Sequence, residues 1–185
     1  MNSINNRVCP VEAAGGLDNK FRKWLQNPQK ILRPYIKNGM TVLDLGCGPG
    51  FFTIEMAKML SDSGKVIAAD LQEGMLDKVR KKINGNSLEE KIELHKCQED
   101  SIGLKEKVDF VLAFYMIHEV PDHDKLFSEI KSLLTPGGLF YVIEPKFHVN
   151  NRAFEVMLGK AKNAGFKIIE TPNVFFSRAV VLRSE

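Results

Sequence analysis

The chain has 185 residues, of which 44% are hydrophobic and 26% are charged. This length suits one domain with a sizeable buried core, and the charge content is ordinary for a soluble protein. The formal net charge of +3 at pH 7 is too small to indicate a nucleic-acid partner. The densest basic cluster, residues 78–82, has no aromatic residues among its charges, as is typical of a solvated helix face.

Cysteine content and terminal composition favour a reducing compartment. Cys9, Cys47 and Cys97 are odd in number and widely spaced, with no C-x-x-C pair, which does not suit a disulfide framework. The first ten residues are polar and lack the apolar segment of a secretory signal. The longest apolar run, residues 110–117, is far shorter than the roughly 20 residues that a transmembrane helix needs. We therefore predict a cytoplasmic protein without membrane insertion.

Residues 1–39 predict two short amphipathic helices, because large apolar side chains recur there at helical spacing. The break between the helices falls near Asn27-Pro28, and Asn38-Gly39 ends the second. The apolar residues are Leu17, Phe21, Trp24 and Leu25 in the first helix, and Ile31, Leu32 and Tyr35 in the second. We predict that residues 1–39 form a helical cap or lid over a site in the domain that spans residues 40–185.

From residue 40 onward, apolar strand-like segments alternate with amphipathic helical segments. Strands are predicted at 40–45, 65–70, 92–97, 108–115 and 139–144, and helices at 51–60, 73–83 and 124–134. A turn over residues 135–138 separates the last of these helices from the strand after it. Such alternation predicts an α/β fold with a mainly parallel sheet.

The remaining segment predicts a helix at 152–163 and two strands at 166–171 and 175–182. Only Pro172-Asn173 and its immediate neighbours join the two strands, which is too short for a helical crossover. These strands must therefore pair antiparallel. The sequence shows no internal repeat or low-complexity linker, so a single domain is predicted.

The chemistry-bearing motif lies at residues 44–50, Asp-Leu-Gly-Cys-Gly-Pro-Gly, between the first predicted strand and the following helix. Glycine lets the chain turn tightly and lets a ligand lie against bare backbone. A glycine turn between strand and helix usually binds a nucleotide-like molecule. Dinucleotide-binding folds use G-x-G-x-x-G, whereas this chain has D-x-G-x-G-x-G.

Ligands of an open α/β sheet bind at the carboxyl ends of the strands, and polar residues collect at these ends here. They are Asp44, Asp70 and Glu144 at the ends of the first, second and fifth strands, residues 98–101 after the third, and His118-Glu119 after the fourth. Asp70 lies about 20 residues beyond the glycine turn, where a carboxylate can accept the ribose hydroxyls of an adenosine.

The glycine motif resembles motif I of the class I S-adenosylmethionine-dependent methyltransferases, and later features follow that family's order. These features are Asp70, Asp100-Ser101, the strand from Val108, and the Pro136-Gly137-Gly138 turn. Glu99 stands where the family's Gly-Asp-Ala motif has glycine. The resemblance implies a Rossmann-like, doubly wound seven-stranded sheet, mainly parallel with an antiparallel C-terminal strand. It also implies S-adenosylmethionine as cofactor and S-adenosylhomocysteine as product.

The resemblance places the cofactor at the ends of the first four strands. It implies that Asp70 binds the ribose, that Asp100 binds the adenine amino group, and that the methionine half lies over residues 46–50. The backbone near Ala113 or Phe114 would contact the amino group of the methionine half. The full set of implied cofactor residues is Asp44, Gly46, Cys47, Gly48, Gly50, Asp70, Leu71, Asp100, Ser101, Ala113 and Phe114.

The implied reaction is an in-line attack by a substrate nucleophile on the sulfonium methyl, for which proximity and orientation supply much of the rate. A general base is needed only if the nucleophile carries a proton. His118 follows the fourth strand and is the candidate base, although it could instead line the substrate site or pack. Tyr115 could line the same pocket, and His148 is a further candidate. The sequence shows no evident metal-ligand set.

The expected substrate is a small, partly apolar molecule, and the resemblance is to the small-molecule branch that includes enzymes acting on quinone precursors. The accepting atom (O, N, S, C or As) and the oligomeric state stay open. Two other functions also stay open. A NAD-dependent oxidoreductase is disfavoured by the glycine spacing and Asp100-Ser101, and a noncatalytic adenosyl-binding protein is compatible with the lack of a decisive catalytic residue.

Overall fold

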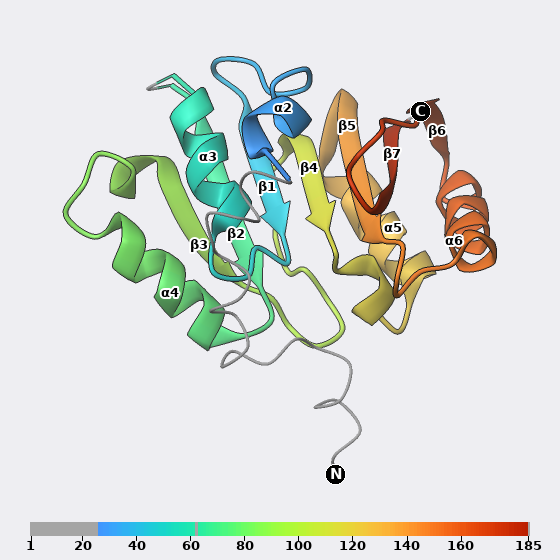
Figure 1. Ribbon diagram of the computed structural model, residues 1–185. Helices are drawn as coiled ribbons and strands as arrows, with labels where there is room; N and C mark the ends of the chain where they lie inside the picture. The colour runs from blue at the N-terminus through green and yellow to red at the C-terminus, as the bar shows by residue number, and fades with distance from the viewer. Residues whose placement is uncertain (1–25, 62, 185) are drawn as a thin grey trace, which may run out of the picture.

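The computed structural model describes residues 26–61 and 63–184 (Figure 1). Within them the chain forms one seven-stranded sheet in the order β3-β2-β1-β4-β5-β7-β6. The strands are β1 Thr41–Leu45, β2 Lys65–Asp70, β3 Ile92–Lys96, β4 Val108–Phe114, β5 Leu134–Pro145, β6 Phe166–Glu170 and β7 Ser177–Ser184. Strands β1 to β5 run parallel to one another, and β7 pairs antiparallel with both β5 and β6. The predicted α/β fold with its antiparallel C-terminal strands is confirmed.

The strand order reverses beside β1, and this reversal positions the site. The chain adds β2 and β3 on one side of β1, then returns to place β4 and β5 on the other side. In register, Leu43 of β1 lies between Ile67 of β2 and Val111 of β4. The crevice outside the carboxyl ends of strands at such a reversal is where open α/β sheets bind ligands.

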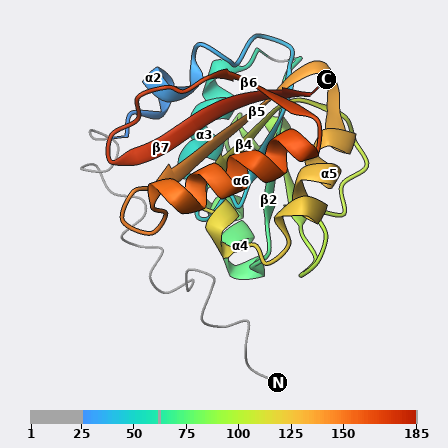
Figure 2. The ribbon, with the colours of Figure 1, turned by 90° about the vertical axis from the view of Figure 1, so that its right-hand side faces the viewer.

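Helices cover both faces of the sheet because its residues alternate between two apolar surfaces. Val42 faces the cluster that includes helices α3 and α4, whereas Leu43 faces the cluster that includes α5 and α6. Figure 2 shows α5 and α6 on their side of the sheet. The helices are α2 Pro28–Leu32, α3 Phe51–Met59, α4 Glu73–Ile83, α5 His123–Leu133 and α6 Asn151–Asn163, and the short 3-10 turns are η2 Glu89–Lys91 and η3 Ile117–Glu119. None of the helices in the described residues is long and apolar enough to cross a membrane.

The N-terminal segment matches its prediction in part. The first predicted helix, with Phe21 and Trp24, lies outside the described residues. The second is reduced to the five residues of α2, which begins where the Asn27 side chain accepts hydrogen bonds from the N–H groups of Gln29 and Lys30 at 3.0 and 3.3 Å. Tyr35 lies beyond this helix and stacks on Phe110 of the sheet.

The predicted turn over residues 135–138 lies inside a strand. β5 already begins at Leu134, which pairs with Val108, but the next rung joins Leu139 to Phe110. The intervening residues of β5 therefore bulge out of the ladder, and Gly137 has a φ of +80°. The last two strands also differ in extent: β6 ends at Glu170 and β7 begins at Ser177, so their connection is longer than the sequence predicted.

Candidate functional site

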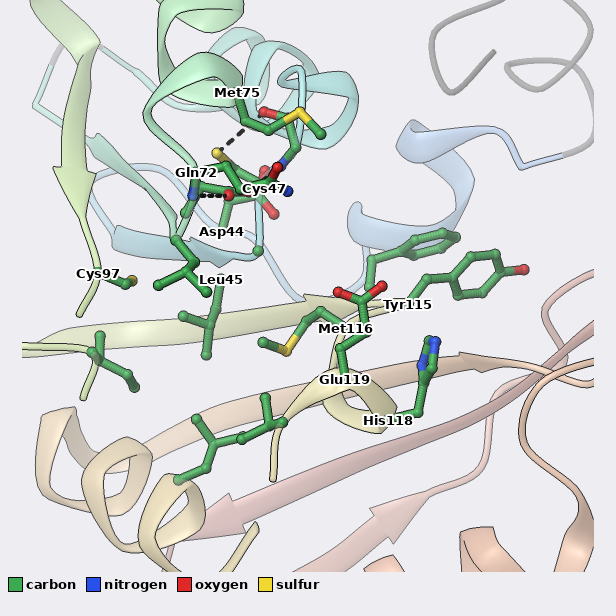
Figure 3. A pocket seen from close by; sticks show the side chains of 18 of the residues that line it. Asp44, Leu45, Cys47, Gln72, Met75, Cys97, Tyr115, Met116, His118 and Glu119 are labelled. Carbon is green, nitrogen blue, oxygen red and sulfur yellow. Dashed lines mark hydrogen bonds between the residues drawn. The ribbon is translucent and has the colours of Figure 1, made fainter. Parts of the chain in front are cut away.

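A cavity of about 610 Å³ opens at the carboxyl ends of the parallel strands (Figure 3). Its walls come from the ends of β1, β2, β4 and β5 and from the loops that follow all five parallel strands. The predicted site residues that line it are Asp44, Gly46, Cys47, Gly48, Asp70, Leu71, Asp100, Ser101, Phe114, Tyr115 and His118. Gly50 and Ala113 are not among the lining residues: Gly50 is the N-cap residue of α3, and Ala113 is fully buried within the sheet.

The glycine loop after β1 adopts a conformation that depends on its glycines. Gly46, Gly48 and Gly50 have φ values of +70°, +53° and +85°, a region that L side chains rarely adopt. A Cβ at Gly46 would lie 2.9 Å from Met116, whereas a Cβ at Gly48 would meet no atom within 4 Å. The Gly48 position therefore leaves open space against the backbone, of the kind a bound ligand could occupy.

Asp44 supports this loop from the end of β1. Its side chain is 2% exposed, and its Oδ2 accepts a 2.6 Å hydrogen bond from the hydroxyl of Thr53 in α3. Since Thr53 lies in the first turn of the helix that the glycine loop opens, the bond fixes the strand end against that helix. The buried carboxylate also gives the loop a negative potential that suits a cationic ligand group.

Asp70, at the end of β2, holds the other side of the loop. One carboxylate oxygen accepts from the N–H of Gly48 and the other from the N–H of Gln72, each at 2.8 Å. Burial raises the pKa of Asp70, although these backbone hydrogen bonds and the charge of Lys96 act in the opposite direction. Each carboxylate oxygen has a second lone pair, so both can still accept ribose hydroxyls.

Asp100 and Ser101 lie at the outer wall of the cavity. The Asp100 side chain is 77% exposed and forms a 3.1 Å ion pair with Lys125 of α5. Ser101 is held by a backbone bridge to Gln98, whose N–H donates to the Ser101 carbonyl at 2.9 Å. The pair therefore lies on a short turn at the mouth of the cavity, and its contact with the cofactor stays a prediction.

The thiols of Cys47 and Cys97 are poor nucleophiles in this setting. Burial, followed by the negative charges of Asp44 and Asp70, raises the pKa of Cys47 well above its ordinary value. Burial also raises the pKa of Cys97 to about 12. Among the described residues no group of three or more His, Cys, Asp or Glu side chains is arranged to hold a metal ion.

Tyr115 follows β4 in a strained backbone conformation, with a φ of +59°. Its ring lies against Phe114, with the ring centroids 4.1 Å apart. Its hydroxyl is 2.6 Å from both the Gln26 side-chain amide and the hydroxyl of Ser177, at the start of β7. Strained residues that persist are usually held by their surroundings and cluster at functional sites, and Tyr115 is held in this way at the cavity wall.

His118 belongs to a hydrogen-bonded chain that sequence reasoning did not find. Its Nδ1 lies 2.5 Å from Oε2 of Glu144, whose residue is 1% exposed at the end of β5, and its Nε2 lies 3.4 Å from Nδ1 of His148. Burial disfavours the charged imidazole, but the Glu144 hydrogen bond and the charges of Glu144 and Glu119 outweigh it and raise the pKa of His118. The sequence indicates Glu144 only as an acid at a strand end. The adjacency of β4 and β5 is the signal that could have paired it with His118.

Figure 3 shows how these groups divide the cavity. Cys47 and Gln72 lie at one end, beside the glycine loop, and Tyr115, His118 and Glu119 lie at the other end. Met116 lies between the two groups. The cavity therefore has one end beside the glycine loop and a second end with aromatic, sulfur-containing and titratable walls.

Comparison with known proteins agrees with this arrangement. Residues 36–172 match the family model described as "Methyltransferase domain". The demethylmenaquinone methyltransferase of Lactobacillus johnsonii is 36% identical over 142 residues, which cover 75% of this chain and 54% of that protein. The ubiquinone/menaquinone biosynthesis C-methyltransferase UbiE of Escherichia coli is 28% identical over 110 residues, which cover 59% of this chain and 44% of that protein. The chain thus spans about half the length of these curated relatives.

A solved structure resembles this chain along nearly its whole length. The S-adenosylmethionine-dependent methyltransferase of Aquifex aeolicus superposes with a TM-score of 0.86 at 29% identity, covering 96% of this chain and 100% of the other. A methyltransferase structure from Methanococcus maripaludis, at 18% identity and a TM-score of 0.77, shares the fold. The family model, which spans most of the chain, and the glycine loop with its partner Asp70 lead to one conclusion: the chain belongs to the methyltransferase domain family.

Proposed function

We propose that this chain is an S-adenosylmethionine-dependent methyltransferase that acts on a small hydroxyaromatic molecule of the quinol type. The observation that carries the proposal is the continuity of one cavity from the glycine loop and Asp70 to Tyr115 and His118. The relatives named as demethylmenaquinone and quinone-biosynthesis methyltransferases support the substrate class.

The residues at the glycine-loop end fit the cofactor. Asp70 offers both carboxylate oxygens to ribose hydroxyls, and Gly48 leaves room for a ligand against its backbone. When bound, S-adenosylmethionine supplies an electrophilic methyl group on a sulfonium. Asp44 provides negative potential near the methionine ammonium, and Asp100-Ser101 closes the adenine end. We assign the amino-group contact to the backbone at Phe114, since Ala113 does not reach the cavity wall.

The other cofactor contacts follow from the family pattern and stay predictions. The backbone of Gly46 and Cys47 would lie under the methionine half, with Gly50 keeping α3 close to the loop. Leu71 follows Asp70 and lines the cavity on the adenine side. The raised pKa of Cys47 argues that its thiol packs rather than reacts.

The residues at the other end suit a partly apolar acceptor. Met116 and the ring of Tyr115 offer apolar and aromatic surface, and His118 places an imidazole nitrogen there. A phenolic or enolic hydroxyl must lose its proton for the ring to become a strong nucleophile, so a base within hydrogen-bond reach accelerates the transfer. We assign this role to His118, with Tyr115 as a substrate contact.

The N-terminal segment, residues 1–39, acts in this proposal as a cap on the domain formed by residues 40–185. Its described part supports the idea at one point, because Gln26 is buried and its side chain donates to the Tyr115 hydroxyl at the acceptor end. We further propose a cytoplasmic location and a small molecule rather than nucleic acid as partner, in keeping with the mild net charge.

Calorimetric titration with S-adenosylhomocysteine, with NADH in parallel, tests the cofactor assignment on wild type and Asp70→Ala. Asp124→Ala is the matched control, because it removes an exposed aspartate that pairs only at the surface with Lys160. We expect micromolar binding of S-adenosylhomocysteine to wild type and the control and its loss in Asp70→Ala. Tighter binding of NADH than of S-adenosylhomocysteine, or no binding of S-adenosylhomocysteine, would contradict the proposal.

Transfer of labelled methyl groups from S-adenosylmethionine to a panel of quinols, phenols, thiols and amines tests the activity. Turnover with a quinol supports the proposal in full. Tight cofactor binding without turnover on any acceptor would favour the noncatalytic adenosyl-binding alternative.

A further inference from the structure

We propose that Glu144 and His148 give His118 a defined proton path: Glu144 orients its imidazole, and His148 carries the proton from it to solvent. This inference rests on the proposed methyl transfer and adds a positioning residue and a proton exit to it. The three residues come from two adjacent parts of the sheet edge, the turn after β4 and the end of β5.

Glu144 is fixed so that it can select one tautomer of His118. Its Oε1 accepts a 2.9 Å hydrogen bond from the N–H of Ile117, within the same 3-10 turn that carries His118. Its Oε2 is therefore directed at Nδ1 of His118. An ionised carboxylate only accepts hydrogen bonds, so Nδ1 must carry the proton and Nε2 is left as the bare nitrogen. A carboxylate that orients a catalytic histidine in this way recurs in unrelated hydrolases.

The bare Nε2 of His118 lies beside His148, and the His118 ring lines the cavity. His118 lines the cavity with 23% of its side chain exposed, and Nδ1 of His148 lies 3.4 Å from Nε2. His148 itself is exposed, and its ring contacts Phe147 at a centroid distance of 4.7 Å. A proton that reaches His118 from the cavity side therefore has a second imidazole beside it that leads to water.

The charges around His118 favour proton capture. Glu144 at the end of β5 and Glu119 on the same turn are negative, and both raise the pKa of His118. The third titratable neighbour is His148, on the loop after β5. The buried position of Glu144 strengthens its effect, because a charge with little solvent around it is weakly screened.

The hydroxyl proton of the acceptor moves to Nε2 of His118, and the O–H electron pair stays on the acceptor as its nucleophilic charge. The acceptor then forms a bond to the methyl carbon as the carbon–sulfur bond breaks and its electron pair goes to sulfur. Where the attacking atom is a ring carbon, the hydrogen on that carbon then moves to the ring oxygen as the ring becomes aromatic again. For this transfer His148 holds its own proton on Nε2 and leaves Nδ1 bare, so His118 passes its proton to that Nδ1 and His148 releases the Nε2 proton to water. Proton exchange between the exposed His148 ring and water then returns it to this tautomer. No oxidant or reductant is needed.

Glu144→Gln is the sharpest test of the positioning role. Its amide oxygen can keep the bond from Ile117 N–H, which leaves the amide NH₂ facing Nδ1 of His118. That donor forces the opposite tautomer, with the proton on Nε2. We expect kcat to fall about a hundredfold or more, with KM and S-adenosylhomocysteine affinity unchanged. Glu155→Gln, on the exposed side of α6, makes the same charge change away from the site and should leave kcat at the wild-type value.

Nitrogen NMR of the histidine side chains reads the tautomer without any substrate. With His118 assigned through His118→Gln, we expect its proton on Nδ1 in wild type and on Nε2 in Glu144→Gln. The same tautomer in both proteins, or an unchanged pH profile of kcat in Glu144→Gln, would overturn the positioning role. This readout separates its failure from that of the proposed function, which would appear as a wild type with no turnover.

His148→Gln tests the exit. We expect a several-fold loss of kcat in weakly buffered solution, and recovery on addition of free imidazole, which can take the proton in place of the missing ring. His118→Gln should not be rescued to the same degree, because it lacks the group that faces the acceptor. The relay would be ruled out if His148→Gln kept the wild-type kcat in weak buffer. It would also be ruled out if free imidazole did not restore the lost kcat. A wild type inactive on every acceptor would overturn the relay together with the proposed function.

Discussion

Asp70 accepts a 2.8 Å hydrogen bond from the backbone N–H of Gly48, which joins the end of β2 to the glycine loop that follows β1. A second bond from Gln72 N–H holds the other carboxylate oxygen at the same distance. The side chain is 7% exposed, so the loop and the carboxylate are fixed before any ligand arrives. Such preorganisation lowers the entropy that binding must overcome.

We expect Asp70→Asn to weaken S-adenosylhomocysteine binding by roughly 10- to 100-fold, which corresponds to about 1.5–3 kcal/mol for hydrogen bonds to a charged group. Asn keeps the size of the side chain but replaces one acceptor oxygen with an NH₂ donor. Titration calorimetry measures the change, with Asp124→Asn as the matched surface control. Equal affinity in Asp70→Asn and wild type would contradict the ribose role.

Gly46→Ala should destabilise the fold more than Gly137→Ala. Both positions have positive φ, +70° and +80°, and so share the cost of a strained backbone. Only at Gly46 would the new Cβ also meet an atom at 2.9 Å, the Cβ of Met116, which cannot rotate away. We expect about 1 kcal/mol of lost unfolding free energy at Gly137 and about 2–4 kcal/mol at Gly46. Urea denaturation measures both, and equal losses would show that Met116 does not constrain the loop.

Features that depend on local residues were predictable from the sequence. The glycine loop is one, because the positive φ at Gly46, Gly48 and Gly50 is a conformation that glycine adopts readily. The pairing of the last two strands is another, since the short chain between them allows no helical crossover. The alternation of apolar segments was sufficient for the parallel part of the sheet.

Features that depend on neighbours distant in sequence were not predictable in this way. The bulge in β5 arises from its register with β4, where Val108 and Phe110 face Leu134 and Leu139. The pairing of His118 with Glu144 joins residues 26 positions apart across the ends of two adjacent strands.

The unfolding free energy should carry a pH dependence that comes from His118. Burial lowers its pKa in the folded protein, but the hydrogen bond to Glu144 and the charges of Glu144 and Glu119 outweigh burial and raise it. Folding therefore favours the protonated imidazole. The added stability is fully present below the unfolded-state pKa of about 6.5, and it is lost as the pH rises through the folded-state pKa.

Glu144→Gln should remove most of this dependence. We expect the difference in unfolding free energy between wild type and Glu144→Gln to be larger at about pH 6 than at about pH 8.5. Urea denaturation across this range measures it, and Glu155→Gln supplies the control for a lost carboxylate elsewhere. Parallel curves for wild type and Glu144→Gln would show that the pair does not set the pKa of His118.

Cys97 and Cys47 should resist alkylation in the folded protein. With the pKa of Cys97 raised to about 12 by burial, its thiolate fraction at pH 8 falls to about one in ten thousand, roughly a thousandfold below that of a free thiol. The pKa of Cys47 is raised in the same direction, by burial and by Asp44 and Asp70. Iodoacetamide labelling followed by peptide mass spectrometry tests this, with the urea-unfolded chain as reference. Labelling of either cysteine at the unfolded rate would show that the folded protein does not raise the pKa of that thiol.

The hydroxyl of Tyr115 should couple the segment before α2 to the acceptor end of the cavity. Tyr115→Phe keeps the ring stacked on Phe114 but removes the hydroxyl that lies 2.6 Å from both the Gln26 side-chain amide and the Ser177 hydroxyl. A double-mutant cycle of Tyr115→Phe with Gln26→Ala should give a coupling energy of about 0.5–1.5 kcal/mol in unfolding free energy. Tyr115→Phe with Lys162→Ala, an exposed position on α6, should show none.

If the cap acts at the acceptor site, both Tyr115→Phe and Gln26→Ala should raise KM for the acceptor. Both should leave S-adenosylhomocysteine affinity unchanged, because the contact lies at the opposite end of the cavity from Asp70. A coupling energy of zero, or an equal loss of cofactor affinity, would remove the support that Gln26 gives to the cap.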